Sequence, residues 1–374
     1  MKMKIDSLEL KRVLNHAERI ASSPKVIPAL NTLLLSVISE TALEVTAFDM
    51  TVGSLGIYNI TEGERGRICV PVKPFASFVK NLGDRMVDVS IKEQVLVLNA
   101  GDLKCKIECT PADNFPVIPV SRDEFENGKI DIEDYSLDSL LDVSYATAKD
   151  SVRACLSGVS IKTSNNAMKF CSTDGHRLGY KEKDVGVAVS LEKGVLVPKS
   201  WAEATSKLLK DSVDDKVSFF VNKKIVAVKV GEVILFSNLL FEDFPDYEEI
   251  LNGKIDVSTR IRAKKTDAVS AVRMAAALTP EKTVRFEITD KEVMLYFDAG
   301  IAQGTGRFDC EYLEGDSSSR TVSLNSAYVL DALDRIKGDY FVLSQGDDMS
   351  PVFIEEDIKQ EGSDSVHLIM PIRQ

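Results

Sequence analysis

The sequence has few of the features that mark membrane, secreted or metal-binding proteins. No apolar run reaches the roughly 18 residues that a membrane-spanning helix needs. The first residues, MKMKIDSLELKRVL, carry charge throughout and lack the apolar stretch of a signal peptide. We therefore expect a cytoplasmic protein that does not engage a membrane.

Cysteine is sparse, with six residues in 374 and no C-x2-C pair. Disulfide bonds are rare in a reducing compartment. Cys105 and Cys109 lie four residues apart in the alternating segment LKCKIEC, which places both on the apolar face of a strand with Leu103 and Ile107. We expect buried structural thiols there, with zinc as the alternative. The sequence contains no cofactor motif.

Histidine is rarer still, with three in the chain. None has the i, i+4 spacing of a metal site, and the P-loop, the GxGxxG fingerprint and the nucleophile elbow are absent. Helix-turn-helix, zinc-finger and aromatic RNP-like signatures are absent too. Lys and Arg number 46 against 58 Asp and Glu, and this net charge of −12 by itself disfavours a nucleic-acid partner.

One plan recurs three times along the chain. Helical starts recur at intervals of 127 residues, at Val70, Val197 and Leu324. Pro71 and Pro198 suit a first helical turn, and Asn325 is a good N-cap residue. An alternating hairpin follows each of these helices, and each copy closes on an apolar-Pro step. These features predict a threefold repeat of about 125 residues, large enough for its own core and too long for a solenoid unit.

Each copy has the order helix, strands, helix, hairpin, strand. Because strands follow one another directly, we predict an α+β fold in which two helices pack on one side of antiparallel sheets. The predicted helices span 7–21, 73–82, 137–148, 199–210, 264–277 and 326–337. The predicted domains are 1–125, 126–253 and 254–374, with polar linkers at 121–134 and 251–259.

The positive charge gathers on those six helices. Their net charge is +5, which leaves −17 on the rest of the chain. If all six faced one way, an anionic polymer could lie on that face through phosphate contacts without sequence preference. Charge alone fits the alternative equally well, in which these Lys and Arg side chains only keep the helices soluble.

The densest local motif is STDGHRLG at 172–179. Its Asp-Gly step predicts a tight turn between two strands. Asp174 and His176 could form the acid and base pair of a hydrolase, but no nucleophile or metal cluster accompanies them. The residues also leave open a purely structural turn and a docking surface.

STDGHRL, FPDY at 244–247 and LIMPIR near the C-terminus resemble the bacterial sliding clamp, the beta subunit of DNA polymerase III. VIPALNTLLL, DNFP and LNSAYVLDAL fall in the order of that family, so the resemblance covers the whole chain. It implies the DNA-clamp fold, with three domains per chain and a head-to-tail homodimer closed around duplex DNA. It also implies a processivity factor of DNA replication that tethers the polymerase and has no enzymatic activity.

The resemblance further implies partners: the alpha subunit of DNA polymerase III, a clamp loader and other proteins with a clamp-binding motif of the Gln-Leu-x-Leu-Phe type. The peptide pocket of the family matches, in this sequence, Leu156, Thr173, Gly175, His176, Arg177, Leu178, Pro245, Ile250, Pro351, Leu368, Ile369, Met370, Pro371, Ile372 and Arg373. Its apolar side chains suit a hydrophobic peptide, with Arg and His donors at the edge. A hydrolase and a monomeric three-domain adaptor are the alternatives.

The resemblance implies that Arg12, Arg153, Lys199, Asn325 and Tyr328 bind DNA, and the basic helices add Lys73, Lys80 and Lys207. It also implies a dimer interface that contains Cys105, Ile107, Ala277 and Leu278. The chain departs from the pattern of the family that it resembles in three places. Glu249 stands where many members carry Arg, Ala154 and Cys155 replace aromatic residues of some members, and 299–309 lacks the acidic cluster of some members. We therefore expect an altered peptide preference, weaker DNA contact at 150–155, and an interface that depends on apolar and backbone pairing.

Overall fold

The computed structural model describes residues 1–22, 27–133, 137–164, 167–185, 191, 194–211, 216–252, 258–300, 302–315, 319–347, 349–358 and 363–373. Contacts divide the chain into two compact units, and each is described by itself. Unit 1 contains Met1–Asp134 and Ser200–Leu239, and unit 2 contains Tyr135–Lys199 and Leu240–Gln374. The three predicted domain boundaries stay a prediction.

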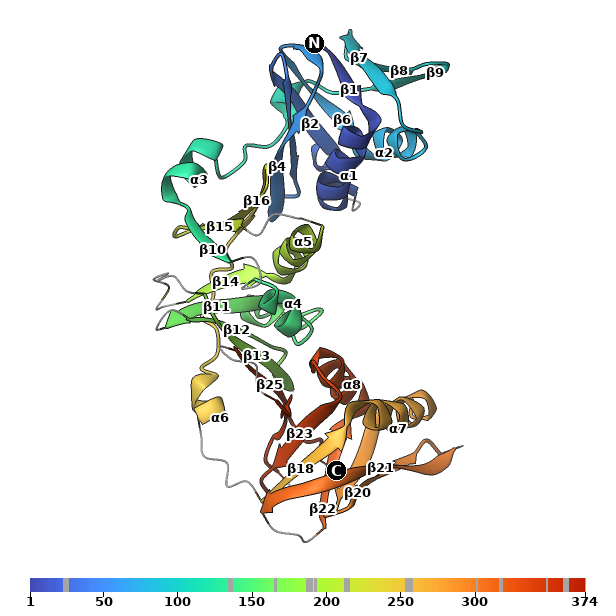
Figure 1. Cartoon of the computed structure of the whole chain (residues 1–374), viewed down its shortest axis with the longest axis vertical. Helices are drawn as coiled ribbons and strands as arrows, with labels where there is room; N and C mark the ends of the chain where they lie inside the picture. The colour runs from blue at the N-terminus through green and yellow to red at the C-terminus, as the bar shows by residue number, and fades with distance from the viewer. Residues whose placement is uncertain are drawn as a thin grey trace. The chain divides into compact units, whose positions relative to one another are not determined.

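Unit 1 combines two antiparallel sheets with amphipathic helices (Figure 1). One sheet has the order β5-β1-β7-β8-β9 and the other β10-β15-β16-β17-β4-β3-β2-β6. The strands are β1 (Lys2–Asp6), β2 (Thr32–Ser39), β3 (Ala42–Phe48), β4 (Val52–Asn59), β5 (Glu62–Glu64), β6 (Gly66–Pro71), β7 (Met86–Lys92), β8 (Val95–Ala100), β9 (Leu103–Glu108), β10 (Ile130–Glu133), β15 (Lys216–Val221), β16 (Ile225–Val230) and β17 (Val233–Asn238). The helices are α1 (Ser7–Ser22), α2 (Val72–Lys80), α3 (Arg122–Gly128) and α5 (Lys199–Lys210).

Unit 2 is built on one continuous sheet of order β14-β11-β12-β13-β25-β24-β23-β18-β21-β20-β19-β22. The strands are β11 (Gly158–Ser164), β12 (Ala167–Thr173), β13 (Arg177–Asp184), β14 (Val195–Pro198), β18 (Thr259–Lys264), β19 (Thr283–Ile288), β20 (Glu292–Asp298), β21 (Gln303–Gly315), β22 (Arg320–Asn325), β23 (Tyr340–Gln345), β24 (Val352–Glu356) and β25 (Ser363–Ile369). The helices are α4 (Ser139–Ser144), α6 (Glu248–Asn252), α7 (Lys265–Leu278) and α8 (Ser326–Arg335).

The predicted helices are confirmed within a few residues, with one exception. Asn325 caps α8 as predicted, because its side-chain oxygen accepts the N–H of Ala327 at 3.0 Å. The helix predicted over 137–148 is shorter and spans only α4. The linker predicted at 121–134 is wrong, since it forms α3 and β10, with Ser121 as N-cap and Phe125 fully buried. Residues 253–257 of the other predicted linker lie outside the described residues.

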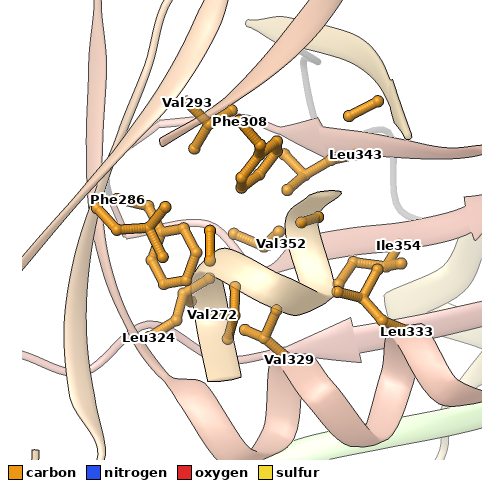
Figure 2. Close-up of a cluster of buried hydrophobic side chains, with 14 of the residues drawn as sticks. Val272, Phe286, Val293, Phe308, Leu324, Val329, Leu333, Leu343, Val352 and Ile354 are labelled. Carbon is orange, nitrogen blue, oxygen red and sulfur yellow. The ribbon is translucent and has the colours of Figure 1, made fainter. Parts of the chain in front are cut away.

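The core of unit 2 lies between α7, α8 and the strands that they cover. Figure 2 shows Val272 of α7 and Val329 and Leu333 of α8 meeting Phe286, Phe308 and other side chains of the sheet. All of these side chains are buried. Because α8 contributes to this core, the positions on its other faces are fixed relative to the sheet.

Two strand pairs join successive copies of the repeat. In unit 1, β4 pairs with β17, and Gly53 lies opposite Phe236. In unit 2, β13 pairs with β25, and Leu178 lies opposite Leu368. Gly53 and Leu178 hold the same place in their hairpins, since the residue five positions before each is its partner on the preceding strand. The two joints are therefore equivalent.

Backbone hydrogen bonds at the ends of both joints support this equivalence. The N–H of Asn238 donates to the carbonyl of Thr51 at 3.0 Å in unit 1, and the N–H of Met370 donates to the carbonyl of His176 at 2.8 Å in unit 2. The side chains of the two joints differ, since Gly53 and Phe236 stand where the other joint has two leucines. A Cβ on Gly53 would lie 2.2 Å from the Phe236 ring, so only glycine leaves room for that ring. The unit 1 joint is thus filled by an aromatic side chain that is fully buried.

Among the unpaired strand edges of the described sheets are those of β9 and of part of β21. β9 ends its sheet and pairs only with β8. In β21, Gln303–Asp309 pair with β20 on one side, while the following residues pair with β18 on the other. The edge of residues 303–309 that faces away from β20 therefore has no described strand partner.

Candidate functional site

The predicted turn within STDGHRLG is confirmed and sits between β12 and β13. Oδ1 of Asp174 accepts the backbone N–H of His176 at 2.9 Å and of Arg177 at 3.0 Å. The hydroxyl of Thr173 donates to the carbonyl of Arg177 at 2.7 Å and accepts the N–H of Gly175 at 3.0 Å. Gly175 has φ +90°, a conformation that glycine adopts without strain. This network holds the exposed His176 at the tip of the turn.

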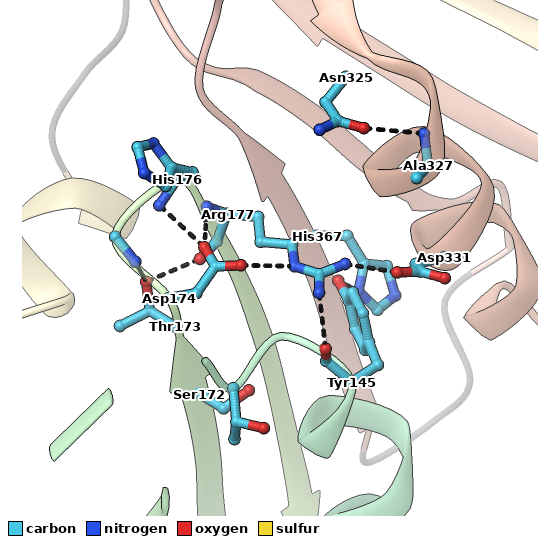
Figure 3. Close-up of polar contacts among 12 residues, drawn as sticks. Tyr145, Ser172, Thr173, Asp174, His176, Arg177, Asn325, Ala327, Asp331 and His367 are labelled. Carbon is cyan, nitrogen blue, oxygen red and sulfur yellow. Dashed lines mark hydrogen bonds and ion pairs between the residues drawn. The ribbon is translucent and has the colours of Figure 1, made fainter. Parts of the chain in front are cut away.

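Arg177 is enclosed by protein groups (Figure 3). Its Nε donates to Oδ2 of Asp174 at 3.0 Å, its Nη1 to Oδ2 of Asp331 at 2.5 Å, and its Nη2 to the carbonyl of Tyr145 at 3.0 Å. The guanidinium also lies 4.2 Å from the ring centre of Tyr328. The Arg177 side chain is 10% exposed, so these contacts replace most of its hydration.

The last strand brings the C-terminal residues to this turn. Leu368 and Ile369 are buried in β25, opposite Leu178 and Arg177. Met370 is 40% exposed, and its backbone is fixed by the hydrogen bond to His176. Ile372 is fixed in turn by an N–H bond of 2.8 Å to the carbonyl of Ser323. Pro371 is half-buried and Arg373 is exposed.

An apolar cluster lies behind the turn. Leu178 and Leu368 pack with Cys171, Tyr180 and Tyr247, and Phe244, Leu251 and Phe353 border them. The remaining predicted pocket residues are close in the chain to members of this cluster or to its strands. Pro245 and Ile250 flank Tyr247, Pro351 precedes β24, and Leu156 lies in a 3-10 turn over Ala154–Ser157. Ile250 is exposed, whereas Leu156, Pro245 and Pro351 are half-buried.

Sequence reasoning missed two residues of this site, Tyr145 and Asp331. Asp331 lies three positions after Tyr328, so both occupy one face of α8. That spacing could have placed them together, but the sequence carries no signal that this face meets Arg177, which is 154 residues away. Tyr145 follows α4, the helix that the sequence predicted least well.

A second polar network lies beneath the site. The hydroxyl of Tyr145 and Nδ1 of His367 are 2.9 Å apart, and His367 is fully buried. Burial, followed by the charges of Lys181 and Arg335, lowers the pKa of His367 to about 3, so its ring is neutral at pH 7. Lys181, also buried, lies 3.7 Å from Oε1 of Glu356. Burial lowers the pKa of Lys181 as well.

The residues predicted to bind DNA are divided between the units. In unit 1, Arg12 pairs with Glu9 and Lys80 pairs with Glu18, each at 2.7 Å, while Lys73 is exposed and Lys207 half-buried. In unit 2, Arg153 lies 3.7 Å from Glu242, Lys199 begins α5 and Asn325 caps α8. Tyr328 has its ring against Arg177, beside the turn. Acidic neighbours thus offset several of these positive charges.

The predicted interface residues lie at element ends and edges. Ile107 is buried and Cys105 half-buried on β9, while Ala277 and Leu278 are exposed at the end of α7. The prediction of a buried thiol is wrong at Cys105, which is half-buried, and Leu103 on the same face is 45% exposed, because β9 lies at the edge of its sheet. Cys109 is buried as predicted.

The described residues bear on the zinc and hydrolase alternatives. No group of three or more His, Cys, Asp or Glu side chains among them is placed to hold a metal ion, and Cys105 and Cys109 belong to no such group. The Asp174 carboxylate is engaged by the turn and by Arg177. Within the described part of the chain, no helix combines the length and hydropathy needed to span a membrane.

Comparison with solved structures defines the class of protein. A crystal structure of the DNA polymerase sliding clamp of Pseudomonas aeruginosa matches over the whole of both chains, with a TM-score of 0.90 and 23% identity. The beta subunit of Thermotoga maritima DNA polymerase III matches with a TM-score of 0.88 and 21% identity, covering 100% of this chain and 99% of that one. The fold is therefore that of a DNA clamp, as the resemblance implied.

Sequence comparison identifies the family. Residues 1–119 match the model of the DNA polymerase III beta subunit N-terminal domain, and residues 132–246 match that of its central domain. The beta sliding clamp of Pseudomonas putida is 26% identical over 357 residues, 93% of each chain, and that of Staphylococcus aureus is 26% identical over 339 residues, 90% of this chain and 86% of that protein.

The two family models together span more than half of the sequence, so the chain belongs to the DNA polymerase III beta subunit family. It is a processivity factor of DNA replication and not an enzyme. Its partners are, in general terms, DNA and a DNA polymerase. The hydrolase and adaptor alternatives are not favoured.

Proposed function

We propose that two copies of this chain form a head-to-tail ring around duplex DNA. Each copy contributes three clamp domains, over 1–125, 126–253 and 254–374. The ring holds DNA topologically, so each phosphate contact can stay weak enough to permit sliding. The alpha subunit of DNA polymerase III, a clamp loader and other proteins with a clamp-binding motif are its partners, and the cytoplasm is its compartment.

The observation that supports the ring is that equivalent strands pair in the two joints between successive copies of the repeat. β4 with β17 and β13 with β25 each pair the fourth strand of one copy with the last strand of the next. The repeat has two strands left in these roles, β21 of the third copy and β9 of the first. Both have unpaired edges within the described residues. A second copy of the chain supplies the partner that each edge lacks.

The two known joints also predict the register of this third one. Transferring their pairing places Lys106 of one copy opposite Gln303 of the other, and Cys105 opposite Gly304. The faces agree, since Lys106 and Gln303 are exposed while Cys105 and Gly304 are half-buried. On the half-buried face, Leu103 and Cys105 then approach the exposed end of α7, where Ala277 and Leu278 lie. This contact would be apolar and backbone-driven, as the missing acidic cluster at 299–309 requires.

DNA contact falls to the basic helices. Arg12, Lys73, Lys80, Lys199 and Lys207 lie on α1, α2 and α5, and Arg153 lies before a short turn. Such side chains bind phosphates without reading bases. Because acidic neighbours pair with Arg12, Lys80 and Arg153, each contact is weakened further, which suits a protein that slides.

The turn at His176 and the C-terminal residues form the proposed peptide site. Exposed His176, Ile250 and Met370 lie at the surface above the apolar cluster of Leu178 and Leu368. Leu and Phe side chains of a clamp-binding peptide would bury against such a surface. Glu249 adds negative charge beside Ile250, which favours peptides with a basic residue at that end.

A cross-linking experiment tests the ring. In a Cys105→Ser background, Gln303→Cys with Lys106→Cys is expected to form disulfides between two copies on oxidation, because directly opposed residues have Cβ atoms roughly 4.5–5.5 Å apart. The oxidised protein, with the solution mass of two copies, should stay on nicked circular DNA at high salt after loading. Linearising the circle should release it.

A matched pair controls for the register. Thr305→Cys with Glu108→Cys is four positions out of register, roughly 13 Å apart, and should not cross-link. Cross-linking of the control pair alone would refute the register. A monomeric solution mass, or release by salt from closed circles as readily as from linear DNA, would refute the ring.

A further inference from the structure

Arg177 lies within the proposed peptide site, yet each of its three guanidinium nitrogens already donates to a protein acceptor. Nε, Nη1 and Nη2 each have a protein acceptor, and one face of the guanidinium is covered by the Tyr328 ring. The side chain is 10% exposed, against 48% for its partner Asp331. Because so little of the Arg177 side chain is exposed, a peptide could reach little of it without displacing these contacts.

The contacts of Arg177 connect two separate elements of unit 2. Asp174 belongs to the turn, whereas Tyr328 and Asp331 belong to α8. α8 is a firm support, because Val329 and Leu333 are buried in the core and Asn325 caps its first turn. The turn has no comparable apolar anchor at its tip, where Gly175 and His176 are exposed.

We propose that Arg177 and Asp331 are positioning residues of the peptide site and do not contact the peptide. Asp331 holds the guanidinium from α8, and the guanidinium holds the turn through Asp174. The proposal rests on the peptide site proposed above and identifies what sets its shape. Asp331 has no place among the residues that the sequence predicted for this site.

The effect reaches the exposed residues of the site through the backbone. The N–H groups of His176 and Arg177 are both held by the Asp174 carboxylate. The carbonyl of His176 in turn accepts the N–H of Met370. When Asp331 is neutralised, Arg177 loses the one contact with a carboxylate outside the turn that the described residues provide. The turn then shifts relative to α8, and His176 and Met370 shift together.

Binding of a fluorescent Gln-Leu-Ser-Leu-Phe peptide to the full chain tests this proposal. Asp331→Asn is expected to weaken binding about five- to tenfold, at the lower end of typical coupling between sites. Asp331→Glu, which keeps the carboxylate, should bind more tightly than Asp331→Asn. Asp334→Asn is the matched control, because Asp334 is exposed on the same helix and takes no part in the Arg177 contacts; its affinity should equal that of the wild type.

A second readout separates positioning from contact. Hydrogen exchange of the amides at 172–178 should accelerate in peptide-free Asp331→Asn and stay unchanged in Asp334→Asn. Unchanged exchange and affinity in Asp331→Asn would overturn the proposal. Weakened binding without faster exchange would also overturn it, since Asp331 would then act by touching the peptide.

The outcomes distinguish this proposal from the site on which it rests. His176→Ala serves as the reference for a direct contact, and should weaken binding without faster exchange at 172–178. If the wild type fails to bind the peptide, the peptide site itself is refuted and the proposal falls with it. If the wild type binds and His176→Ala weakens binding, but Asp331→Asn does not, only the positioning role is refuted.

Discussion

Acidification should loosen β25 through one buried histidine. Burial and two nearby positive charges lower the pKa of His367 to about 3, against 6.5 for an unhindered histidine. Below pH 6.5 His367 therefore becomes protonated in the unfolded chain, while it stays neutral in the folded chain until the pH approaches 3. His367 contributes stability that is fully present above pH 6.5 and is lost progressively as the pH falls towards 3.

The size of the effect follows from this difference in pKa. Between pH 7 and pH 5 the unfolded histidine changes from mostly neutral to almost fully protonated, while the folded one stays neutral. Integrating the linkage over that interval gives a loss of about 2 kcal/mol in the free energy of unfolding. His367→Gln has no group that titrates here, and its amide can still bond to the Tyr145 hydroxyl. The variant is expected to lack this part of the pH dependence.

Native-state hydrogen exchange of Ser363–Ile369 measures the effect on the strand itself, after correction for intrinsic exchange rates. Urea unfolding at pH 7 and pH 5, followed by far-UV circular dichroism, gives the comparison for the whole chain. The burial of His16 also lowers its pKa, so it contributes equally to wild type and variant. The difference between the two proteins therefore isolates His367.

Equal pH dependence of exchange in wild type and His367→Gln would refute this reasoning. It would mean that the folded protein accepts a proton at position 367 near pH 6, which requires water or a carboxylate to reach the ring. A variant that unfolds at pH 7 would leave the comparison to His367→Asn, the shorter amide.

Two substitutions test the packing of the joints and the buried charge. Gly53→Ala should destabilise unit 1 by about 2 kcal/mol or more, because the new Cβ would lie 2.2 Å from the Phe236 ring. Gly83→Ala is the control and should be nearly neutral, since the nearest atom to its Cβ would lie at 3.5 Å. The fluorescence of the single tryptophan follows unfolding of both variants. Lys181→Met should cost about 3–5 kcal/mol by leaving two carboxylates without their buried cation, and adding Glu356→Gln should recover part of it in urea unfolding. Neutral effects of Gly53→Ala or Lys181→Met would contradict these contacts.

The sequence predicts those elements whose signal is local. The amphipathic helices α1, α5, α7 and α8 follow from apolar spacing and caps, and the hairpins follow from alternation. α4 is shorter than its pattern because the backbone after Ser144 forms turns, in which Ala146 donates to Val143 and Thr147 donates to Ser144. α3 was missed because a single apolar residue, Phe125, anchors it in an otherwise polar segment.

The candidate site was predictable only in part. The turn at Asp174–Arg177 carries its own signal in the Asp-Gly step, and family resemblance pointed to the C-terminal residues. The pairing of β13 with β25 and the contact of Arg177 with Asp331 join positions more than 150 residues apart. Such contacts depend on how whole strands and helices pack, and no spacing in the sequence encodes them.

The paired joints of this chain show how duplication can divide labour within one polypeptide. The same backbone pairing occurs in both joints, with the same hydrogen bond at its end. Only in the first joint does a phenylalanine ring, that of Phe236, pack over a glycine, Gly53. Because the Phe236 ring is fully buried, it stabilises this first strand pair but gives a partner nothing to bind. The second strand pair, with Leu178 opposite Leu368, lies beside the exposed His176 and Met370. The same backbone pairing can therefore support a binding surface in one place and a closed core in the other.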